Sequence, residues 1–381
     1  VYPNNFTSRN FQEKYWKSTQ VFLGFIIGIY PVKKRTDLQT FLKNVFMIKL
    51  ALIGIGKMGL SHLSILGAHP KVQITGVCDS SSMVTDVISR FSPFPCFTDY
   101  HSMISTISAD AFLVAVPTKL HASIVEELIR LKKHVFVEKP FCMHVEDSNR
   151  LASLAEHYGV VNQVGFHNRF IGTFTEVRRL VTEGWIGDIY HFHAQAYGPV
   201  VLRPYQTSWR SNNVEGGGCL MDYASHVIDL VQYILGPVES VDSRELRKIF
   251  SKNVEDAVYA VLTLSSKIKG MLSVNWSDET YRKMSTSIQL NGTSGKIIAD
   301  ANELKIYFKS SNVPTDYEKG WNVRYITDLT PPVNFYLRGE EYTAQLDYFI
   351  EQIENTIDNP LNSFRSAAHT DLAISLIKEF K

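Results

Sequence analysis

Short apolar runs alternate with amphipathic stretches along the first half of the chain. A short apolar run bounded by glycine or polar residues predicts a buried parallel strand, and apolar residues spaced i, i+3, i+4 and i+7 predict a helix with one covered face. Strands and helices that alternate in this way predict a parallel sheet covered on both faces. The expected strands cover 48–53, 72–78, 111–116, 134–137 and 160–164, with helices after 59 and over 83–91, 122–131 and 145–158.

The second half of the chain has a different pattern, in which large and polar residues alternate from about residue 170 onward. A two-residue period is typical of strands covered on one face, and short turns between strands predict antiparallel pairing. We therefore predict an α/β protein with two domains, 47–167 with the parallel sheet and 168–381 with a mainly antiparallel sheet. The expected strands cover 189–197, 258–264, 270–276, 287–290 and 296–299, with helices over 222–235, 342–357 and 366–380.

The first 46 residues do not follow either pattern. They contain one apolar stretch, 21–30, which is followed by Lys33, Lys34 and Arg35, and no small-residue cleavage site comes after it. A secretory signal needs such a site. We interpret 1–46 as a leader outside the fold, with a weak membrane-surface anchor as the alternative.

Composition narrows the class of protein. Lys and Arg number 39 and Asp and Glu number 38, which gives a net charge of +1, and 45% of the residues are hydrophobic. This balance excludes the basic footprint of a general nucleic-acid binder and the composition of a disordered chain. No apolar run approaches the ~20 residues that cross a bilayer, so we expect no membrane span.

The four cysteines bear on compartment and metal binding. They form no CxxC pair and have no histidine partner at zinc-finger spacing, which argues against a disulfide scaffold and a structural zinc site. We therefore expect no metal and a reducing compartment, the cytoplasm. The cysteines are Cys78, Cys96, Cys142 and Cys219.

A glycine loop follows the first expected strand. In Gly54-Ile55-Gly56-Lys57-Met58-Gly59 the glycines permit a tight turn, close approach of a pyrophosphate, and close helix packing. Asp79 lies 20 residues after Gly59, at the end of the second strand, as the dinucleotide-binding fingerprint requires. A carboxylate there favours NAD over NADP because it would repel a 2′-phosphate. Serines 80–82 could still bind that phosphate, so NADP remains open.

Two further segments carry candidate chemistry. Asp222 and His226 follow three glycines and are four residues apart, so they share one helix face, where a carboxylate could stabilise an imidazolium and orient a general base. A capping Asp and a buried structural His are the alternative. Glu138-Lys139-Pro140 ends a parallel strand, where ligands of open α/β sheets bind. The bond before Pro140 could be cis or trans.

Taken together, these motifs resemble the family of glucose–fructose oxidoreductase, inositol dehydrogenase and their relatives (Gfo/Idh/MocA type). The resemblance spans about 47–381 and rests on 54–59, 138–140, 165–170 and 216–226. It implies an N-terminal Rossmann dinucleotide-binding domain and a C-terminal α/β domain whose open, mainly antiparallel sheet often forms homo-oligomers (dimers or tetramers). It also implies a catalytic set of Lys139, Asp222 and His226, and a cofactor loop of Pro117, Thr118 and His121, with Glu138 and Lys139 also at the cofactor.

The resemblance implies an NAD(P)-dependent oxidoreductase that transfers a hydride between nicotinamide and a secondary alcohol of a sugar, polyol or nucleotide sugar. We expect His226 to take the hydroxyl proton, Asp222 to stabilise the imidazolium, and Lys139 to bind the same oxygen. The exact substrate and direction stay open, as do two alternatives: an NAD-dependent glycosidase and a non-catalytic nicotinamide-sensing regulator. Expected substrate contacts are Asn168, Arg169, Arg210, Asp222 and His226, and Arg203, Trp209 and Tyr223 are further candidates.

Overall fold

The computed structural model of the protein describes residues 47–200, 209–355 and 361–380. Residues Ile48–Lys381 group into one compact unit. The interpretation of the leader concerns residues 1–46, which lie outside the described residues, as does the candidate Arg203. Within the described part of the chain, no helix is both long enough and apolar enough to cross a membrane.

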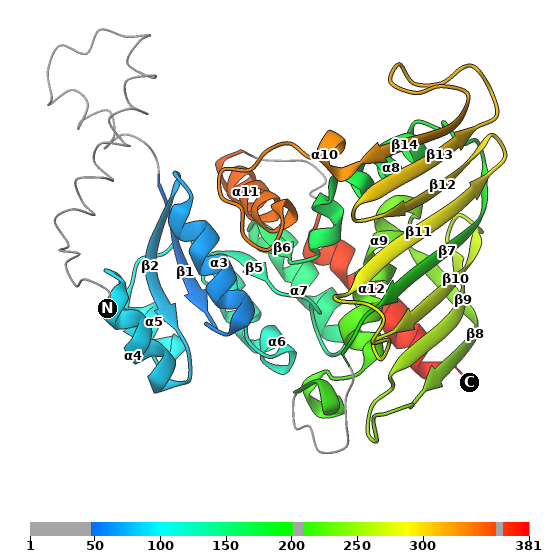
Figure 1. Cartoon of the computed structure of the whole chain (residues 1–381). Coiled ribbons are helices and arrows are strands. Elements are labelled where there is room, and N and C mark those ends of the chain that lie inside the picture. The colour runs from blue at the N-terminus through cyan, green and yellow to red at the C-terminus, as the bar shows by residue number, and fades with distance from the viewer. Residues whose placement is uncertain (1–46, 201–208, 356–360, 381) are drawn as a thin grey trace, which may run out of the picture. The chain divides into compact units, whose positions relative to one another are not determined.

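The first domain is built on a six-stranded parallel sheet (Figure 1). All residues of its central strand β1 except Lys49 are buried, as expected for a strand covered on both faces. The strand order β3-β2-β1-β4-β5-β6 is that of the doubly wound dinucleotide-binding fold, which confirms the predicted fold class. The strands are β1 (Ile48–Ile53), β2 (Val72–Cys78), β3 (Cys96–Phe97), β4 (Ala111–Val114), β5 (His134–Val137) and β6 (Asn162–Val164).

Helices cover both faces of this sheet. One face packs against apolar residues of α3 and α11, and the other packs against α5, α6, α7 and the first turns of α12. The helices from the first half of the chain are α3 (Lys57–Ala68), α4 (Ser82–Phe91), α5 (Tyr100–Thr106), α6 (His121–Arg130) and α7 (Val145–Tyr158), and α4 packs with partly buried side chains on the same side as α3. The short turn η1 (Thr118–Leu120) precedes α6.

The second domain is built on an eight-stranded sheet in the order β14-β13-β12-β11-β7-β10-β9-β8. All neighbours pair antiparallel except β7 and β10, so the prediction of a mainly antiparallel sheet is confirmed. The strands are β7 (Ile189–Tyr197), β8 (Val238–Arg247), β9 (Ala257–Leu264), β10 (Lys269–Asn275), β11 (Ser285–Gly292), β12 (Gly295–Asp300), β13 (Glu303–Phe308) and β14 (Gly320–Tyr325).

One face of this sheet is covered by helices, and the other is bare in Figure 1. The covering helices are α8, α9 and the second half of α12, whose apolar residues share one core with the inner side chains of the strands. The helical elements are η2 (His167–Phe170), α8 (Gly172–Thr182), η3 (Trp209–Ser211), η4 (Asn213–Glu215), the π-helical turn η5 (Leu220–Ala224), α9 (Ser225–Leu235), α10 (Ile326–Leu329), α11 (Glu340–Glu354) and α12 (Phe364–Glu379).

Several elements were not predicted from the sequence: β3, β8, β13, β14, α5 and α8. The strands β8 and β14 lie at the two edges of the sheet, and β14 has no buried residue, so it lacks the apolar alternation that marks a covered strand. The predicted helix over 222–235 is also wrong at its start. The chain forms the π-helical turn η5 first, and the regular helix α9 begins only at Ser225.

The last two helices connect the two domains. In α12, Phe364 and Ala367 belong to the core of the first domain, whereas Ile374 and Ile377 belong to the core of the second. Phe349 of α11 packs in the first domain as well. The boundary between 167 and 168 stays a prediction, and the packing adds that these C-terminal helices complete the first domain.

Candidate active site

The glycine loop joins the carboxyl end of β1 to α3. Gly54 has a φ of +92°, and a Cβ there would lie 2.5 Å from the carbonyl oxygen of Ala115, while a Cβ at Gly59 would lie 1.9 Å from that of Gly54. These close contacts require glycine. Gly56 differs, because a Cβ there would meet nothing within 4 Å. The open space lies at the N-terminus of α3, which has no side-chain cap and no acidic residue in its first turn, so a cofactor pyrophosphate fits there.

Asp79 is held beside this loop at the end of β2. Its Oδ2 accepts a hydrogen bond from the Ile55 amide at 2.7 Å, and its Oδ1 accepts one from the Ser81 amide at 2.9 Å. The carboxylate thus lies beside the glycine loop, and its contact with a ribose stays a prediction. Lys57 and Met58, the other predicted cofactor contacts, begin α3 with exposed and partly exposed side chains.

The predicted cofactor loop after β4 divides into exposed and buried residues. Pro117 is exposed and Thr118 is buried. His121 is 1% exposed, with Nδ1 3.0 Å from the carbonyl oxygen of Pro140 and Nε2 2.9 Å from that of Val116. Burial lowers the pKa of His121, and the carbonyl oxygens of Val116, Phe141 and Pro140 that its ring nitrogens face act in the opposite direction. In this structure His121 ties the loop after β4 to the loop after β5 rather than facing a cofactor.

Lys139 and Asp222 form the centre of the candidate site. Lys139 Nζ donates to Asp222 Oδ1 at 2.8 Å and to the Asp222 carbonyl oxygen at 3.2 Å. Arg210 Nε donates to the other carboxylate oxygen at 2.8 Å, and its guanidinium lies over the Trp209 ring at 4.6 Å. Burial alone would raise the pKa of Asp222, but the two cations outweigh it and hold that pKa below its usual value. The structure therefore places an ionised carboxylate between two cations where the domains meet.

The glycine run before this turn allows the approach. A Cβ at Gly217 would lie 2.3 Å from the Arg210 carbonyl oxygen, and a Cβ at Gly218 would lie 2.3 Å from the Glu255 carboxylate. Gly216 and Gly218 also have positive φ values of +84° and +107°. These glycines thus let the backbone pass close to Arg210 and Glu255.

His226 is brought to the site, but not by Asp222. Among the described residues no hydrogen bond or ion pair joins the two side chains, and His226 Nδ1 is buried without a partner. The predicted Asp222–His226 contact is therefore wrong, because the carboxylate is occupied by Lys139 and Arg210 and the π-helical turn precedes His226. Burial, together with nearby Lys139 and His167, holds the pKa of His226 well below its usual value.

Two predicted substrate contacts lie in η2. Asn168 is buried, and its Nδ2 has no partner among the described residues. Arg169 is also buried. Its Nε and Nη2 donate to Asp229 at 2.9 and 2.5 Å, and its Nη1 contacts the Leu361 carbonyl oxygen. In this structure Arg169 is a buried ion-pair partner of α9 and also lines a cavity of about 490 Å³, and its contact with a substrate stays a prediction.

Sequence reasoning missed three neighbours of the site. His62 of α3 contacts Glu138, with Nε2 2.6 Å from Oε1. The His167 ring lies edge-on to His226, with centroids 4.9 Å apart, and stacks on Tyr342 of α11 at 4.7 Å. His167 lies within the quoted segment 165–170, and His62 is a polar residue on the buried face of a helix, so both carried a signal in the sequence.

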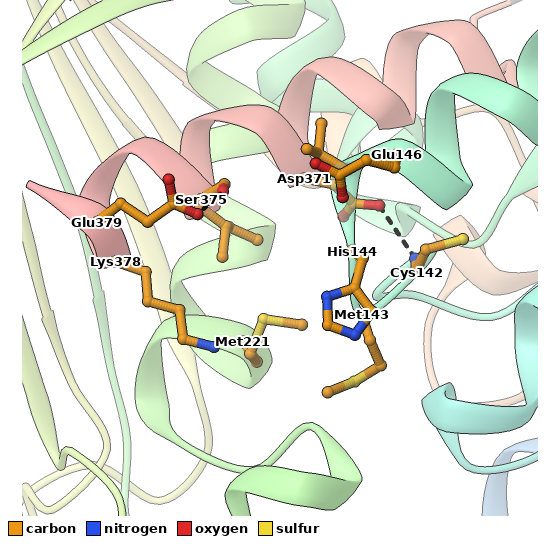
Figure 2. Close-up of a pocket in the computed structure, with 11 residues that line it drawn as sticks. Cys142, Met143, His144, Glu146, Met221, Asp371, Ser375, Lys378 and Glu379 are labelled. Atoms are coloured by element: carbon orange, nitrogen blue, oxygen red, sulfur yellow. Dashed lines mark hydrogen bonds between the residues drawn. The ribbon is translucent and has the colours of Figure 1, made fainter.

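A cavity of about 300 Å³ lies between the start of α7, η5 and α12 (Figure 2). Its lining includes His144, Met221 and Asp371, and the Cys142 amide donates to Asp371 Oδ2 at 3.0 Å. Burial raises the pKa of Asp371 to about 7. Lys139, Asp222 and His226 all lie in the described part of the chain, and none of their side chains lines this cavity. The cavity is therefore separate from the candidate site.

Comparison with known proteins supports the two-domain organisation. Residues 48–166 match a family described as the oxidoreductase family with an NAD-binding Rossmann fold, and residues 174–298 match the GFO/IDH/MocA C-terminal domain. Myo-inositol 2-dehydrogenase of Thermotoga maritima is 25% identical over 259 residues, which cover 66% of this chain and 75% of that protein. D-glucoside 3-dehydrogenase of Escherichia coli is 27% identical over 206 residues, 53% of this chain and 58% of that protein.

Solved structures agree on the fold. Levoglucosan dehydrogenase in complex with NADH superimposes with a TM-score of 0.77 at 22% identity, covering 87% of this chain and 96% of that one. At this identity the likeness supports the architecture alone. Together with the two domain matches, it shows that the chain belongs to the Gfo/Idh/MocA family of oxidoreductases and that residues 48–166 form its NAD-binding Rossmann domain.

Proposed function

We propose that the protein is an NAD(P)-dependent dehydrogenase that interconverts a secondary alcohol and a ketone on a sugar, a polyol or a nucleotide sugar. The observation that carries the proposal is the contact between Lys139 Nζ and Asp222 Oδ1 at 2.8 Å, with His226 one turn further along. It sets an ammonium, a carboxylate and an imidazole at the end of β5, beside the NAD-binding edge of the sheet. The names of the inositol and glucoside relatives support the substrate class.

His226 is proposed as the general base. Its lowered pKa keeps the imidazole neutral at physiological pH, so a ring nitrogen can accept the proton of a substrate hydroxyl. When bound, NAD supplies the acceptor for the hydride. The chain's part is to hold the hydroxyl and remove its proton.

Lys139, held in place by Asp222, is proposed to stabilise the negative charge that develops on the substrate oxygen. The Lys139 ammonium carries three donors, two of which contact Asp222, so one remains to bind the oxygen and offset its developing negative charge. Asp222 positions Lys139 and Arg210 through its two carboxylate oxygens. This role replaces the one predicted from the sequence, in which Asp222 acted on His226.

The bare face of the second sheet is proposed as a contact surface between copies of the chain. Its exposed apolar side chains lie on β9, β10 and β14 and all point away from the covering helices. Monomeric proteins rarely leave such a surface open. The exposed residues are Tyr259, Met271, Trp321, Val323 and Tyr325.

The proposed function is tested by incubating the full chain with NAD or NADP and a panel of polyols, aldoses and nucleotide sugars, while reduced nicotinamide is followed by absorbance. We expect at least one compound to produce reduced cofactor, and the same compound to raise the melting temperature of the NAD-bound protein. Cofactor binding without reduction across the panel would contradict the proposal. Release of a leaving group without net reduced cofactor would favour the glycosidase alternative.

A further inference from the structure

A buried pair connects the cofactor helix to the strand that carries Lys139. His62 lies on the buried face of α3, two turns after the glycine loop begins, and Glu138 follows β5 directly. His62 Nε2 and Glu138 Oε1 are 2.6 Å apart, and the two side chains are 0% and 11% exposed. An ionised carboxylate can only accept hydrogen bonds, so the His62 nitrogen is the donor.

The second carboxylate oxygen faces the backbone of Lys139. Glu138 Oε2 accepts a hydrogen bond from the Lys139 amide at 3.2 Å. Space for the carboxylate is kept by Gly165, where a Cβ would lie 3.2 Å from its carbon and from both of its oxygens. A line of contacts therefore runs from α3 through His62, Glu138 and Lys139 to Asp222.

Burying this polar pair requires more desolvation free energy than an apolar contact between the helix and the sheet would. Elsewhere α3 packs on the sheet with Leu63 and Leu66, which lose nothing by leaving water. Burying a histidine and a carboxylate requires both to be desolvated, and well-packed apolar residues of similar volume often serve stability equally well. The pair is therefore better explained by the contact that Glu138 makes with the Lys139 backbone than by its contribution to packing.

We propose that His62 and Glu138 are positioning residues that fix the backbone of Lys139 relative to the cofactor helix. The inference rests on the proposed function, because Lys139 is there the group that binds the substrate oxygen. Neither residue needs to touch substrate. If pyrophosphate binding at the N-terminus of α3 shifts this helix, His62 and Glu138 would displace Lys139 with it.

Four titratable groups face the Glu138 carboxylate, and they bear on how it behaves. They are His62 of α3, Lys139 itself, His167 of η2 and Tyr342 of α11, and His121 of α6 is a fifth that interacts with the same carboxylate. Burial opposes ionisation of Glu138, but the hydrogen bond from His62 and the charge of Lys139 outweigh it and hold its pKa below the usual value. Glu138 is thus an anion beside Lys139 throughout the neutral range.

The test uses three variants of the full chain and one control. His62→Leu removes the donor and keeps an apolar body, His62→Gln keeps a side-chain N–H near the position of Nε2, and Glu138→Gln removes the charge and keeps the shape. Ser61→Ala is the control, since Ser61 is the neighbouring residue of α3 and its hydroxyl donates only to the Lys57 carbonyl. Melting temperature reports on folding in each variant.

The first readout is the rate of Lys139 acetylation in the protein without cofactor, measured by peptide mass spectrometry against the exposed Lys267. We expect His62→Leu and Glu138→Gln to change this rate by about threefold or more, as for residues in one hydrogen-bond network. His62→Gln and Ser61→Ala should stay close to the wild type. Because this readout needs no turnover, it decides the inference even if the proposed function fails.

The second readout is the split between kcat and KM on whichever panel compound is oxidised. We expect His62→Leu to lower kcat by about 10- to 100-fold, the usual effect of a small misplacement of a reacting group, with partial recovery in His62→Gln. Its KM should change little. Folded His62→Leu and Glu138→Gln proteins with wild-type Lys139 acetylation would overturn the inference, whatever their melting temperatures.

Discussion

The glycine loop and the Asp222–His226 turn both carry residues that the sequence singled out, yet they are held by different forces. Gly54 and Gly59 are required by backbone contacts within the loop or with the adjacent strand end, so spacing alone describes the loop well. The partners of Asp222 are Lys139, 83 residues away, and Arg210, 12 residues away. Backbone-determined sites can thus be predicted in detail, whereas charge networks assembled by the fold can be predicted only as a set of residues.

The largest effect should come from the turn, at His226. His226→Ala removes the proposed proton acceptor, so we expect turnover to fall by roughly 100- to 10,000-fold. NAD affinity, measured by fluorescence titration, should change little because the glycine loop and Asp79 lie in the other domain. His101→Ala, at an exposed histidine of α5, serves as the control. Near wild-type turnover in His226→Ala would show that this histidine is structural and that the Asp222–His226 turn does not supply the proton acceptor.

Lys139 should show the next largest effect, because it lies in the first domain and contacts the Asp222–His226 turn of the second. Lys139→Ala removes the donor for the substrate oxygen, and we expect turnover to fall by roughly 100- to 1,000-fold. It also leaves Asp222 buried with Arg210 as its one remaining cation partner among the described residues, so the melting temperature should fall as well. A variant that loses activity but keeps full thermal stability would show that the Lys139–Asp222 contact contributes little to the fold.

Asp222→Asn should have a smaller effect on turnover, about 10- to 100-fold, and a distinct pH signature. The pKa of Asp222 is held below its usual value of 3.8 by Lys139 and Arg210 against the effect of burial. Its charge therefore stabilises the native state above the unfolded-state pKa, and this stability is lost as pH falls through the lower folded-state pKa.

We therefore expect the wild type to exceed Asp222→Asn in melting temperature by a constant amount between about pH 5 and 8. The difference should shrink below about pH 4, where the wild-type carboxylate begins to bind a proton. A difference that grows on acidification would contradict the ion pairs described here.

The glycine-loop side of the comparison is tested by cofactor choice. Replacing Asp79 by Ala together with Ser80→Arg removes the charge that repels a 2′-phosphate and adds a cation for it. We expect the ratio of NAD to NADP affinities to change by about tenfold or more toward NADP, with turnover on the better cofactor retained. A wild type that already binds NADP more tightly than NAD would contradict the role given to Asp79.

Substitutions on the bare face of the second sheet should have the smallest effect on turnover. Trp321→Glu with Val323→Glu places two charges among the exposed apolar side chains of β14. We expect the molar mass from light scattering to fall to that of a smaller species, with kcat within about twofold of the wild type because neither residue lies at the site. An unchanged mass would show that copies associate elsewhere or not at all.

Most of the fold could be predicted from the sequence because the strands are short apolar runs in the first sheet and alternate apolar and polar residues in the second. β1, β2, β5 and β7 have the predicted bounds. The edge strands β8 and β14 could not be found, since strands with little or no covered surface need no apolar alternation. The domain assignment of α12 was incomplete for a related reason: one helix contributes to two cores, and its pattern does not reveal which.

At the site, the residue types were easier to predict than their contacts. Lys139, Asp222 and Arg210 come together in the structure, but the spacing of Asp222 and His226 suggested a contact that the π-helical turn and two competing cations prevent. Arg169 was chosen for its charge, and its long-range partner Asp229 could not be known before the fold. His62 was passed over because a histidine among apolar helix positions looks like core until its partner is seen.

The central claim is hydride transfer between a substrate carbinol carbon and the nicotinamide. It is tested most directly with the panel compound that reduces the cofactor, prepared with deuterium at the carbon that is oxidised, and mass analysis of the cofactor after reaction. We predict one deuterium in each reduced nicotinamide formed by the wild type, and almost no reduced cofactor with His226→Ala. Deuterium released to water, or retained in a product formed without reduced cofactor, would contradict the claim.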